Sequence, residues 1–261
     1  MKALSIIKIG GNIIDSPENL QTFLKDFASI EGLKILVHGG GKLATEIGSR
    51  LGIAPNYVQG RRITDEATIE LVTMVYGGLI NKKIIAALQA LSCDAIGLTG
   101  ADGNTISATR RPVDKIDFGF VGDVTRKGVN SNFIAQLLNA GLTPVFAPLT
   151  HDGQGQMLNT NADTIAQELA AALSKAFQVR LIYCFEKAGV LRNPSDETSV
   201  IPQIDKSNFE KLLAEGIISE GMIPKLSNAF TALDAGVSAI TIGHAKDLKH
   251  ILLGKKGTKI L

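Results

Sequence analysis

The sequence predicts an α/β protein whose mostly parallel central sheet is sandwiched by helices in a three-layer α/β/α arrangement. Short apolar runs rich in β-branched residues, typical of buried strands, alternate with amphipathic helical patterns along almost the whole chain. The 261 residues include 45% apolar and 20% charged side chains, the balance of a globular protein with a sizeable core. Strands that are separated by helices form parallel sheets covered on both faces.

Composition excludes several classes of protein. The 27 basic and 25 acidic residues give a net charge of +2, and with no Trp the chain shows neither a basic footprint nor a stacking platform for nucleic acid. No apolar run reaches the roughly 18 residues of a membrane span. The first strand-like run contains Lys8 and ends in two glycines, unlike a signal peptide. Cys93 and Cys184 have no CxxC partner, which favours a reduced cytoplasmic setting over a disulfide framework or a zinc site.

The first half of the chain begins with a buried strand that ends in Gly10-Gly11. Ser16 can cap the following helix, and Pro17 fits its first position. A long helical pattern is interrupted only by Gly77-Gly78, which weaken it. The predicted strands are residues 3–9, 34–37, 95–98 and 143–147, and the predicted helices run from residue 16, from 41 to about 51, from 65 to 90 and from 130 to 140. Residues 103–127 predict a rim hairpin with strands at 105–108 and 118–124.

The second half continues the alternation. Predicted helices are residues 161–174, 207–215 and 219–235, predicted strands are 179–183 and 239–242, and a loop with two prolines covers 191–205. No free linker interrupts the chain. We therefore expect a single domain over residues 1–261, whose composition changes near residue 150 and divides it into lobes of about 1–150 and 151–261.

Two glycine-rich turns follow neighbouring predicted strands, after Lys8-Ile9 and at His38-Gly39-Gly40-Gly41. Parallel strands bring their carboxyl ends to one edge, where ligands bind in such folds. Glycine lets backbone N–H groups approach an anion, and a helix start adds positive potential. Lys8 is thus a candidate phosphate-binding lysine, although a lysine that snorkels from a strand end would also fit the pattern.

The second turn also matches, loosely, the glycine fingerprint of a dinucleotide site. That fingerprint requires an acidic residue about 20 positions further on. The corresponding region instead contains the turn Gly60-Arg61-Arg62, which disfavours a dinucleotide oxidoreductase. The Walker pattern GxxxxGK[ST] is absent as well, because Leu43 follows Lys42.

Other candidate binding residues lie further along the chain. Arg62 could bind a substrate carboxylate through two parallel hydrogen bonds, or it could be a solvated surface arginine. Asn161 is a good helix cap that places Asp163 in the first turn, but capping does not explain Asn159. Lys225 lies early in a predicted helix that Ser219 can cap and in which Pro224 is tolerated only near the start. A cation there opposes the helix dipole, which hints at a function.

Together these motifs resemble the amino-acid kinase family over nearly the whole chain. The matching strings are KIGGN (8–12), HGGG (38–41), GRRIT (60–64), LNTNAD (158–163), EGMIPK (220–225) and GTKI (257–260). Each string is weak alone, but their order and spacing are specific. Within the family, GRRIT with NxNAD is similar to the members that act on an N-acylated glutamate, and not to those that act on carbamate, aspartate, uridylate or glutamate.

The resemblance implies the amino-acid kinase fold and an ATP-dependent phosphorylation of the side-chain carboxylate of an N-acylated L-glutamate, with the acetyl group as the default and a succinyl group as the alternative. Lys8 and Lys225 would neutralise the transferring phosphoryl group, and Asp163 would hold both lysines. Gly40, Gly41, Arg62 and Asn159 would bind the acyl amino acid. ATP, carrying Mg²⁺ on its phosphates without a protein metal site, would contact Gly10, Gly11, Asn161, Glu186, Gly189, Leu191, Gly221 and Met222. The lobe of residues 1–150 would bind the acyl amino acid, and that of 151–261 would bind ATP.

One string departs from the family pattern. Glu186 replaces an Asp beside the nucleotide, and Phe185 stands where a small hydroxyl residue is common. A binding protein that had lost catalysis would be expected to lack Lys8, Lys225 or Asp163, but all three are present.

The resemblance also implies an assembly. Arginine-regulated members carry a helix before the first strand, whereas only residues 1–3 precede residue 4 here. We therefore expect a cytoplasmic homodimer that is insensitive to arginine, with the helix over 65–90 in its interface.

Overall fold

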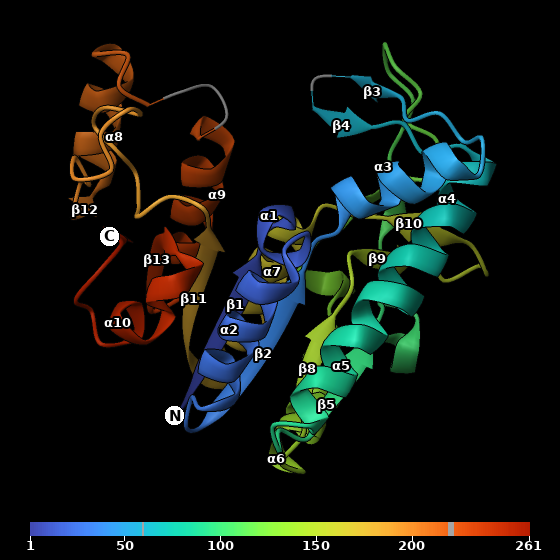
Figure 1. The fold of residues 1–261 in the computed structure, drawn as a ribbon, viewed down its shortest axis with the longest axis horizontal. Helices are drawn as coiled ribbons and strands as arrows, with labels where there is room; N and C mark the ends of the chain where they lie inside the picture. Colours follow the sequence, from blue (N-terminus) through green and yellow to red (C-terminus); the bar gives the residue numbers. More distant parts are fainter. Residues whose placement is uncertain (59, 219–221) are drawn as a thin grey trace.

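A central sheet of eight strands in the order β12-β14-β13-β11-β1-β2-β8-β5 organises the computed structural model, which describes residues 1–58, 60–218 and 222–261 (Figure 1). Its pairings are parallel except that β14 runs antiparallel to β13. The strands of this sheet are β1 (Lys2–Ile9), β2 (Leu33–His38), β5 (Ala95–Leu98), β8 (Thr143–Phe146), β11 (Phe177–Phe185), β12 (Gln203–Ile204), β13 (Ala239–His244) and β14 (Thr258–Ile260).

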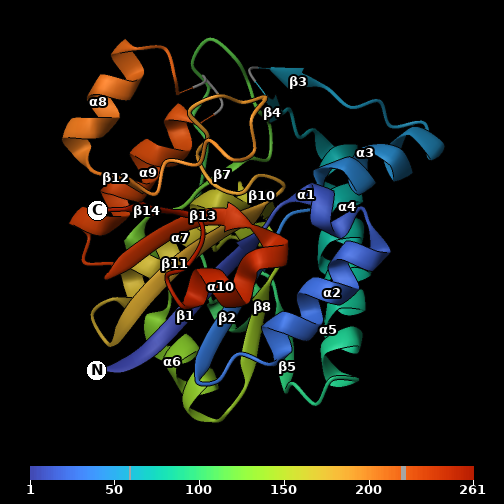
Figure 2. The ribbon, with the colours of Figure 1, turned by 60° about the vertical axis from the view of Figure 1, so that its left-hand side comes forward.

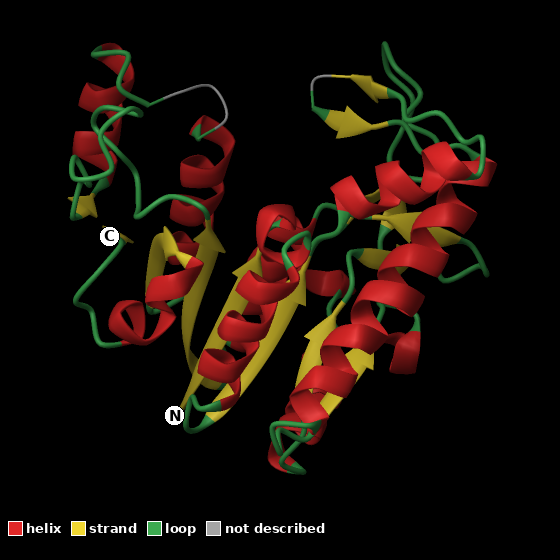
Figure 3. Cartoon of the chain, viewed as in Figure 1, coloured by secondary structure: helices red, strands yellow, loops and turns green. Residues whose placement is uncertain are grey.

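Helices cover both faces of this sheet (Figure 3). One face packs against α2 (Pro17–Ala28), α4 (Glu66–Val72), α5 (Asn81–Gln89) and α10 (Leu248–Leu252). The other face packs against α6 (Ser131–Asn139), α7 (Ala162–Leu173), α8 (Lys206–Ala214) and α9 (Ile223–Asp234). The turned view shows these two helical layers with the sheet between them (Figure 2). The predicted α/β/α fold with a mostly parallel sheet is confirmed.

Shorter elements complete the chain around the carboxyl edge of the sheet. They are α1 (Gly11–Ile14), α3 (Gly41–Arg50), the hairpins β3–β4 (Tyr57–Val58, Arg61–Arg62), β6–β7 (Thr109–Arg110, Gly122–Asp123) and β9–β10 (Leu149–His151, Met157–Asn159), and short 3₁₀ turns at Asp102–Asn104, Arg126–Gly128 and Ala245–Asp247. In Figure 1 the β3–β4 hairpin and the α8–α9 pair stand on opposite sides of this edge.

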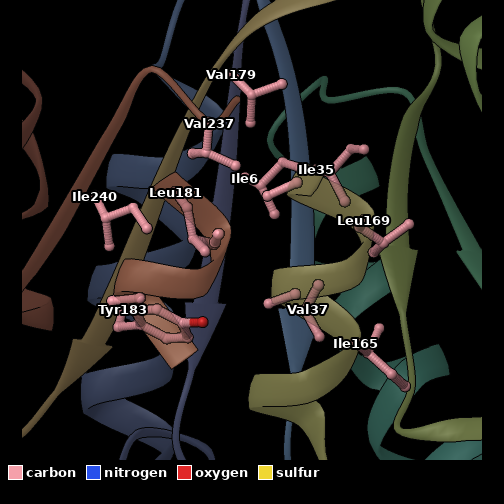
Figure 4. Packing of buried hydrophobic residues seen from close by; sticks show 14 of the residues in the cluster. Ile6, Ile35, Val37, Ile165, Leu169, Val179, Leu181, Tyr183, Val237 and Ile240 are labelled. Atoms are coloured by element: carbon pink, nitrogen blue, oxygen red, sulfur yellow. The ribbon is translucent and has the colours of Figure 1, made fainter. Parts of the chain in front are cut away.

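The core shows why α7 is central to the fold. Its Ile165 and Leu169 pack against Ile6, Val37 and other side chains from β1, β2 and β11, all of them buried (Figure 4). Asn161 caps this helix by accepting hydrogen bonds from the backbone N–H groups of the two residues after Ala162. Because the first turn of α7 lies over the carboxyl ends of the strands, packing of its apolar face also positions its polar start.

Most predicted elements are found within one or two residues of their predicted ends. Ser16 caps α2 and Pro17 begins it, as predicted. The rim hairpin exists, but its strands are Thr109–Arg110 and Gly122–Asp123, so the strand predicted at 105–108 is wrong. That stretch does not form a strand: Thr105 has helical backbone angles, and Ile106 and Ser107 make only isolated bridges to other segments. The predicted cap Ser219 lies outside the described residues.

The longest helix, Glu66–Gln89, is apolar enough to cross a membrane by length and composition alone, with a mean hydropathy of 1.4. Its inward side chains belong to the core beside α2 and the sheet, as in a core helix of a globular protein. Its middle, Thr73–Ile80, is a π-helix that contains Gly77-Gly78 and is named η1 below. The weakening expected from the two glycines is therefore a change of helical type and not a break.

Candidate active site

Three adjacent strands end at the same level of the sheet. Ile9 of β1 is in register with His38 of β2 and with Cys184 of β11. The turns that follow are tied to this edge, since the Gly39 N–H donates to the Ile9 carbonyl at 3.3 Å and the Gly10 N–H donates to the Cys184 carbonyl at 3.3 Å. The helices α3 and α7 also begin here, so two positive helix ends face one region.

Strand alternation directs Lys8 toward the start of α7. Leu4, Ile6 and Lys8 share the sheet face that α7 covers, and the last of these lies where the core gives way to the edge. Its Nζ forms an ion pair with Oδ1 of Asp163 at 2.7 Å, with side chains only 14% and 19% exposed. The predicted contact between this lysine and Asp163 is therefore present.

The charge state of Asp163 follows from its surroundings. Burial opposes its ionisation, but the adjacent Lys8 ammonium, with its hydrogen bond, and the more distant charge of Lys225 outweigh burial and lower the pKa of the carboxyl. Asp163 is therefore a carboxylate at neutral pH, and it serves as a fixed negative anchor for a cation and not as a proton donor.

Lys225 approaches the same region from α9 in a different way. Its Nζ lies over the ring of Phe185 at 5.2 Å from the centroid. Phe185 follows Leu181 and Tyr183 on the face of β11 that α9 and α7 cover, and so its ring lies beneath the lysine. Asp163 forms an ion pair with Lys8 and, among the described contacts, not with Lys225, so the role of this carboxylate in holding both lysines stays a prediction.

A cavity of about 550 Å³ opens beside these groups. Its lining includes glycine turns, the start of α7, Lys225 and a set of arginines: Arg61, Arg62 and Arg111. Arg111 is neutralised by Asp123 at 2.5 Å. The remaining lining cations outnumber the carboxylate of Asp163, so the cavity favours an anionic ligand.

Arg62 is held rigidly at the cavity wall. Its Nη2 donates to the Gly41 carbonyl at 2.8 Å, to Thr45 Oγ1 at 2.6 Å and to the hydroxyl of Tyr57, whose ring also lies against the guanidinium. All three of these hydrogen bonds use Nη2. A guanidinium fixed through one nitrogen is suited to binding a carboxylate with its other donors.

The second glycine turn and Asn159 complete the wall. Gly40 has φ of +153°, and a Cβ there would lie 3.1 Å from the Tyr76 ring and closer still to Ile80, so the position requires glycine. The Asn159 amide nitrogen donates to Thr64 Oγ1 at 3.0 Å and lines the same cavity. All four residues predicted for the acyl amino acid, Gly40, Gly41, Arg62 and Asn159, therefore lie together.

The residues predicted to contact ATP are more scattered. Asn161 lines the large cavity, whereas Glu186 lines a smaller one of about 90 Å³ with Asn12, Phe185, His244 and Lys246. Gly189 packs against Thr258, and Leu191 is buried and bridged to Val200. Gly10 and Gly11 form the turn after β1, and Met222 precedes α9. Gly221 lies outside the described residues.

Sequence reasoning missed several cavity residues. Tyr57 and Tyr76 carry no motif, and only their positions near Arg62 and Gly77 could have suggested a role. The partner of His38 was missed as well. Its ring contacts Asn81, which lies inside the long helical pattern and reaches the turn only through the tertiary fold.

Comparison with known proteins places this site in a family. Residues 3–244 match the amino acid kinase family. The chain belongs to this family. Within it, the chain is 57% identical over 264 residues to the acetylglutamate kinase of Cytophaga hutchinsonii, covering 100% of this chain and 99% of that protein. It is 54% identical over 260 residues to the acetylglutamate kinase of Parabacteroides distasonis, covering 100% of both chains. The predicted family is confirmed.

Solved structures share the fold of this amino acid kinase. N-acetylglutamate synthase from Neisseria gonorrhoeae, complexed with coenzyme A and N-acetyl-glutamate, matches 98% of the chain with a TM-score of 0.83 and 21% identity, and the chain spans 59% of that protein. Carbamate kinase from Giardia lamblia, bound to AMP-PNP, matches 100% of the chain and 98% of its own length, with a TM-score of 0.71 and 14% identity. At such identities the likeness concerns the fold alone.

Proposed function

We propose that this chain is an acetylglutamate kinase, which transfers the γ-phosphoryl group of ATP to the side-chain carboxylate of N-acetyl-L-glutamate in the second step of arginine biosynthesis. The observation that carries the proposal is the Lys8–Asp163 pair, which lies beside two glycine turns at the edge of a cavity that also holds Arg62. The near-full-length identity to acetylglutamate kinases supports the same activity.

The proposed reaction needs no general base. A carboxylate is ionised at neutral pH, so one of its oxygens attacks the γ-phosphorus, and the bond from phosphorus to the β-bridging oxygen breaks, leaving its electron pair on ADP. Catalysis then reduces to positioning and charge stabilisation. Lys8 and Lys225 stabilise charge on the phosphoryl oxygens, Asp163 fixes Lys8, and N–H groups of the glycine turns donate hydrogen bonds to the anion.

We propose that the two lobes divide the substrates. Residues of about 1–150 supply Gly40, Gly41 and Arg62 for the acyl amino acid, with Asn159 added from across the cavity. Residues of about 151–261 bind ATP, with Gly10 and Gly11 reaching its phosphates from the first lobe.

In the described part of the chain no three His, Cys, Asp or Glu side chains are grouped as a metal site. Mg²⁺ is therefore proposed to enter on the phosphates of ATP, where it neutralises part of their charge.

The alternative substrate carries a succinyl group in place of the acetyl group. Arg61 lines the cavity in addition to Arg62, so a second carboxylate, as in N-succinyl-L-glutamate, would also meet positive charge. A coupled ADP-release assay should compare N-acetyl-, N-succinyl- and free L-glutamate. We expect turnover with N-acetylglutamate and little with free glutamate. Greater kcat/KM with the succinyl substrate would establish the alternative, and ATP consumption independent of an acyl amino acid would overturn both.

We further propose a cytoplasmic homodimer. On the outer side of the long helix Glu66–Gln89, Met74 is 58% exposed and Leu79 36% exposed, an apolar surface suited to a two-fold contact. Light scattering at assay concentrations tests this assembly, and a monomer would contradict it.

A further inference from the structure

A buried chain of hydrogen bonds links the second glycine turn to the long helix. His38, the last residue of β2, and Asn81, the first residue of α5, are 0% and 1% exposed. The His38 Nδ1 lies 2.7 Å from the Gly39 carbonyl oxygen, and Nε2 lies 3.1 Å from Asn81 Nδ2. The same Nδ2 lies 3.0 Å from the Val145 carbonyl oxygen of β8.

The chemistry of these partners determines which atom donates the hydrogen in each hydrogen bond. A carbonyl oxygen only accepts, so Nδ1 of His38 carries the hydrogen and Nε2 presents its lone pair. Asn81 Nδ2 has two hydrogens, one for Nε2 and one for the Val145 carbonyl, and its Oδ1 accepts from Lys82 Nζ at 3.2 Å. Burial lowers the pKa of His38 to about 4, and the nearby Lys82 charge acts in the same direction. The ring is therefore neutral, with a single tautomer.

This chain of bonds determines which way the Gly39–Gly40 peptide faces. The peptide is trans, so the Gly40 N–H points opposite to the Gly39 carbonyl, which His38 holds toward the interior. Gly40 lines the large cavity, and in the described part of the chain its N–H donates to no backbone carbonyl. Tyr76 and Ile80, both in η1, cover the position where a Cβ of Gly40 would be.

Packing alone does not require this polar pair. Replacing two hydrogen-bonded partners by apolar groups of the same shape can be nearly neutral for stability. The surroundings are nevertheless built to hold it: a Cβ at Gly97 of β5 would collide with Asn81 Oδ1, so the absence of a side chain there makes room for the amide. Asn81 also follows directly on η1, so the same helix covers Gly40 and fixes the ring behind it.

We infer that His38 and Asn81 are positioning residues that orient the Gly39–Gly40 peptide, so that the Gly40 N–H is presented to the carboxylate of the acyl amino acid. The inference rests on the proposed function, which gives the cavity this substrate. The hydrogen bond from the His38 ring to the Gly39 carbonyl orients the peptide directly. Asn81 acts indirectly, because it fixes the orientation and the tautomer of that ring.

Two substitutions at one position separate positioning from packing. In His38→Asn the side-chain amide nitrogen can occupy the place of Nδ1 and keep the bond to Gly39, whereas in His38→Gln the terminal amide falls at the place of Nε2 and the bond to Gly39 is lost. We expect His38→Gln to lower kcat/KM for the acyl amino acid roughly 10- to 100-fold, the effect of one lost hydrogen bond to a charged group, with KM for ATP within about twofold. His38→Asn should stay within about threefold of the wild type.

Lys34→Met is the matched control. Lys34 lies in the same strand, is buried, and donates to the Ala28 and Ile30 carbonyls at 2.8 and 2.7 Å, so its loss also removes buried hydrogen bonds. It should lower thermal stability and leave kcat/KM per folded molecule unchanged. Equal losses of kcat/KM in His38→Asn and His38→Gln, or a matching loss in Lys34→Met, would overturn the inference.

A measurement without turnover keeps this test separate from the proposed function. Long-range ¹H–¹⁵N spectra of the wild-type chain should show His38 as the Nδ1–H tautomer, and the amide resonance of Gly40 should shift in His38→Gln far more than in His38→Asn. An Nε2–H tautomer in the wild type would overturn the inference whether or not the chain phosphorylates acetylglutamate. Absence of turnover together with the expected spectra would reject the proposed function and leave the orientation of the peptide intact.

Discussion

Lys8 and Lys225 bring the same charge to one site from opposite sides, but the fold holds them differently. Lys8 projects from the end of a central strand and forms an ion pair with Asp163 at 2.7 Å. Lys225 projects from the start of α9 and lies over the Phe185 ring at 5.2 Å. A short ion pair with a hydrogen bond fixes direction and distance, whereas a cation over a ring face is held more loosely. The first lysine is thus part of the framework, and the second can adjust its position.

The difference extends to the surroundings of each lysine. Around Lys8, the sheet edge, the capped start of α7 and Arg62 are each tied by hydrogen bonds to the surrounding structure. Around Lys225, the neighbours are an aromatic ring and the more scattered residues predicted to contact ATP. The groups around Lys8 and Arg62, which we propose to bind the acyl amino acid, are therefore preorganised. The difference also implies that removing each lysine will have distinguishable consequences.

The largest effect is expected for Lys8→Ala. Removing one preorganised charge from a transition state typically costs about 2.7–4 kcal/mol, so kcat should fall by roughly 10²–10³ with a smaller change in KM for the acyl amino acid. The substitution also leaves Asp163 without its partner, which should lower the free energy of unfolding by about 1–3 kcal/mol. Steady-state kinetics at saturating ATP and urea unfolding measure the two effects. Lys256→Ala, which removes an exposed ion pair with Asp247, is the control and should change neither.

The stability loss in Lys8→Ala should depend on pH. In the wild type the pKa of Asp163 is lowered by Lys8, against the opposing effect of burial, so its ion pair stabilises the fold above the ordinary carboxyl pKa and loses this contribution as the pH falls. Without Lys8, burial dominates and the pKa rises. The difference in unfolding free energy between wild type and variant should therefore be full at neutral pH and shrink in acid. A pH-independent difference would show that the ion pair is not its source.

Lys225→Ala should lower kcat by a comparable factor, about 10² or slightly more, because it removes a charge that we propose acts on the same phosphoryl group. Its stability should stay within about 0.5 kcal/mol of the wild type, since a cation over a ring at a half-exposed site contributes little. The same kinetic and urea measurements apply. Near-normal kcat would remove Lys225 from the catalytic assignment, and a stability loss equal to that of Lys8→Ala would erase the distinction between the two lysines.

Arg62→Ala tests the rigidly held groups at the cavity wall. We expect KM for the acyl amino acid to rise roughly 10- to 100-fold, the effect of losing charge-assisted hydrogen bonds, with little change in KM for ATP. Arg62→Lys should not restore binding, because an ammonium cannot bridge Gly41 and Tyr57 and still offer a planar pair of donors. Arg110→Ala, an exposed arginine of β6, serves as the control. A collapse of ATP affinity in Arg62→Ala would instead assign the arginine to the nucleotide.

Local patterns predicted much of the fold. The ends of β5 and the caps of α2 and α7 follow from neighbouring residues, so Ser16 and Asn161 could be identified from the sequence. The π-helix η1 could not, because no local sequence pattern distinguished Thr73–Ile80 from the α-helix on either side. The strand β14 was missed for a related reason: it spans only Thr258–Ile260, and its antiparallel pairing depends on β13 being already in place.

Candidate site residues that belong to recognisable sequence motifs could be identified from the sequence. Contacts between residues distant in the chain could not. Lys8, Asp163 and Arg62 belong to recognisable strings, and the structure brings them to one edge. The contacts of Lys225 with Phe185 and of His38 with Asn81 join segments distant in the chain. Neither contact leaves a local pattern, since nothing in the sequence near Lys225 or His38 points to its partner.

The smallest effect is expected at Phe185, whose ring contacts Lys225, the more loosely held of the two lysines. Phe185→Leu keeps an apolar side chain but removes the ring face. Loss of a cation–π contact of about 0.5–1 kcal/mol should lower kcat roughly two- to fivefold. Phe209→Leu is the matched control, because it disrupts an aromatic pair with Phe230 at 5.4 Å between centroids, away from the cavity, and should leave kcat unchanged.

A double-mutant cycle tests whether the small effect of Phe185→Leu acts through Lys225. If the ring acts by holding Lys225, then Phe185→Leu should lower kcat in the wild-type background and have almost no further effect in Lys225→Ala, since the cation it positions is gone. An equal loss in both backgrounds would mean that Phe185 contributes through the neighbouring small cavity that it also lines, and Lys225 would then be positioned by its helix alone.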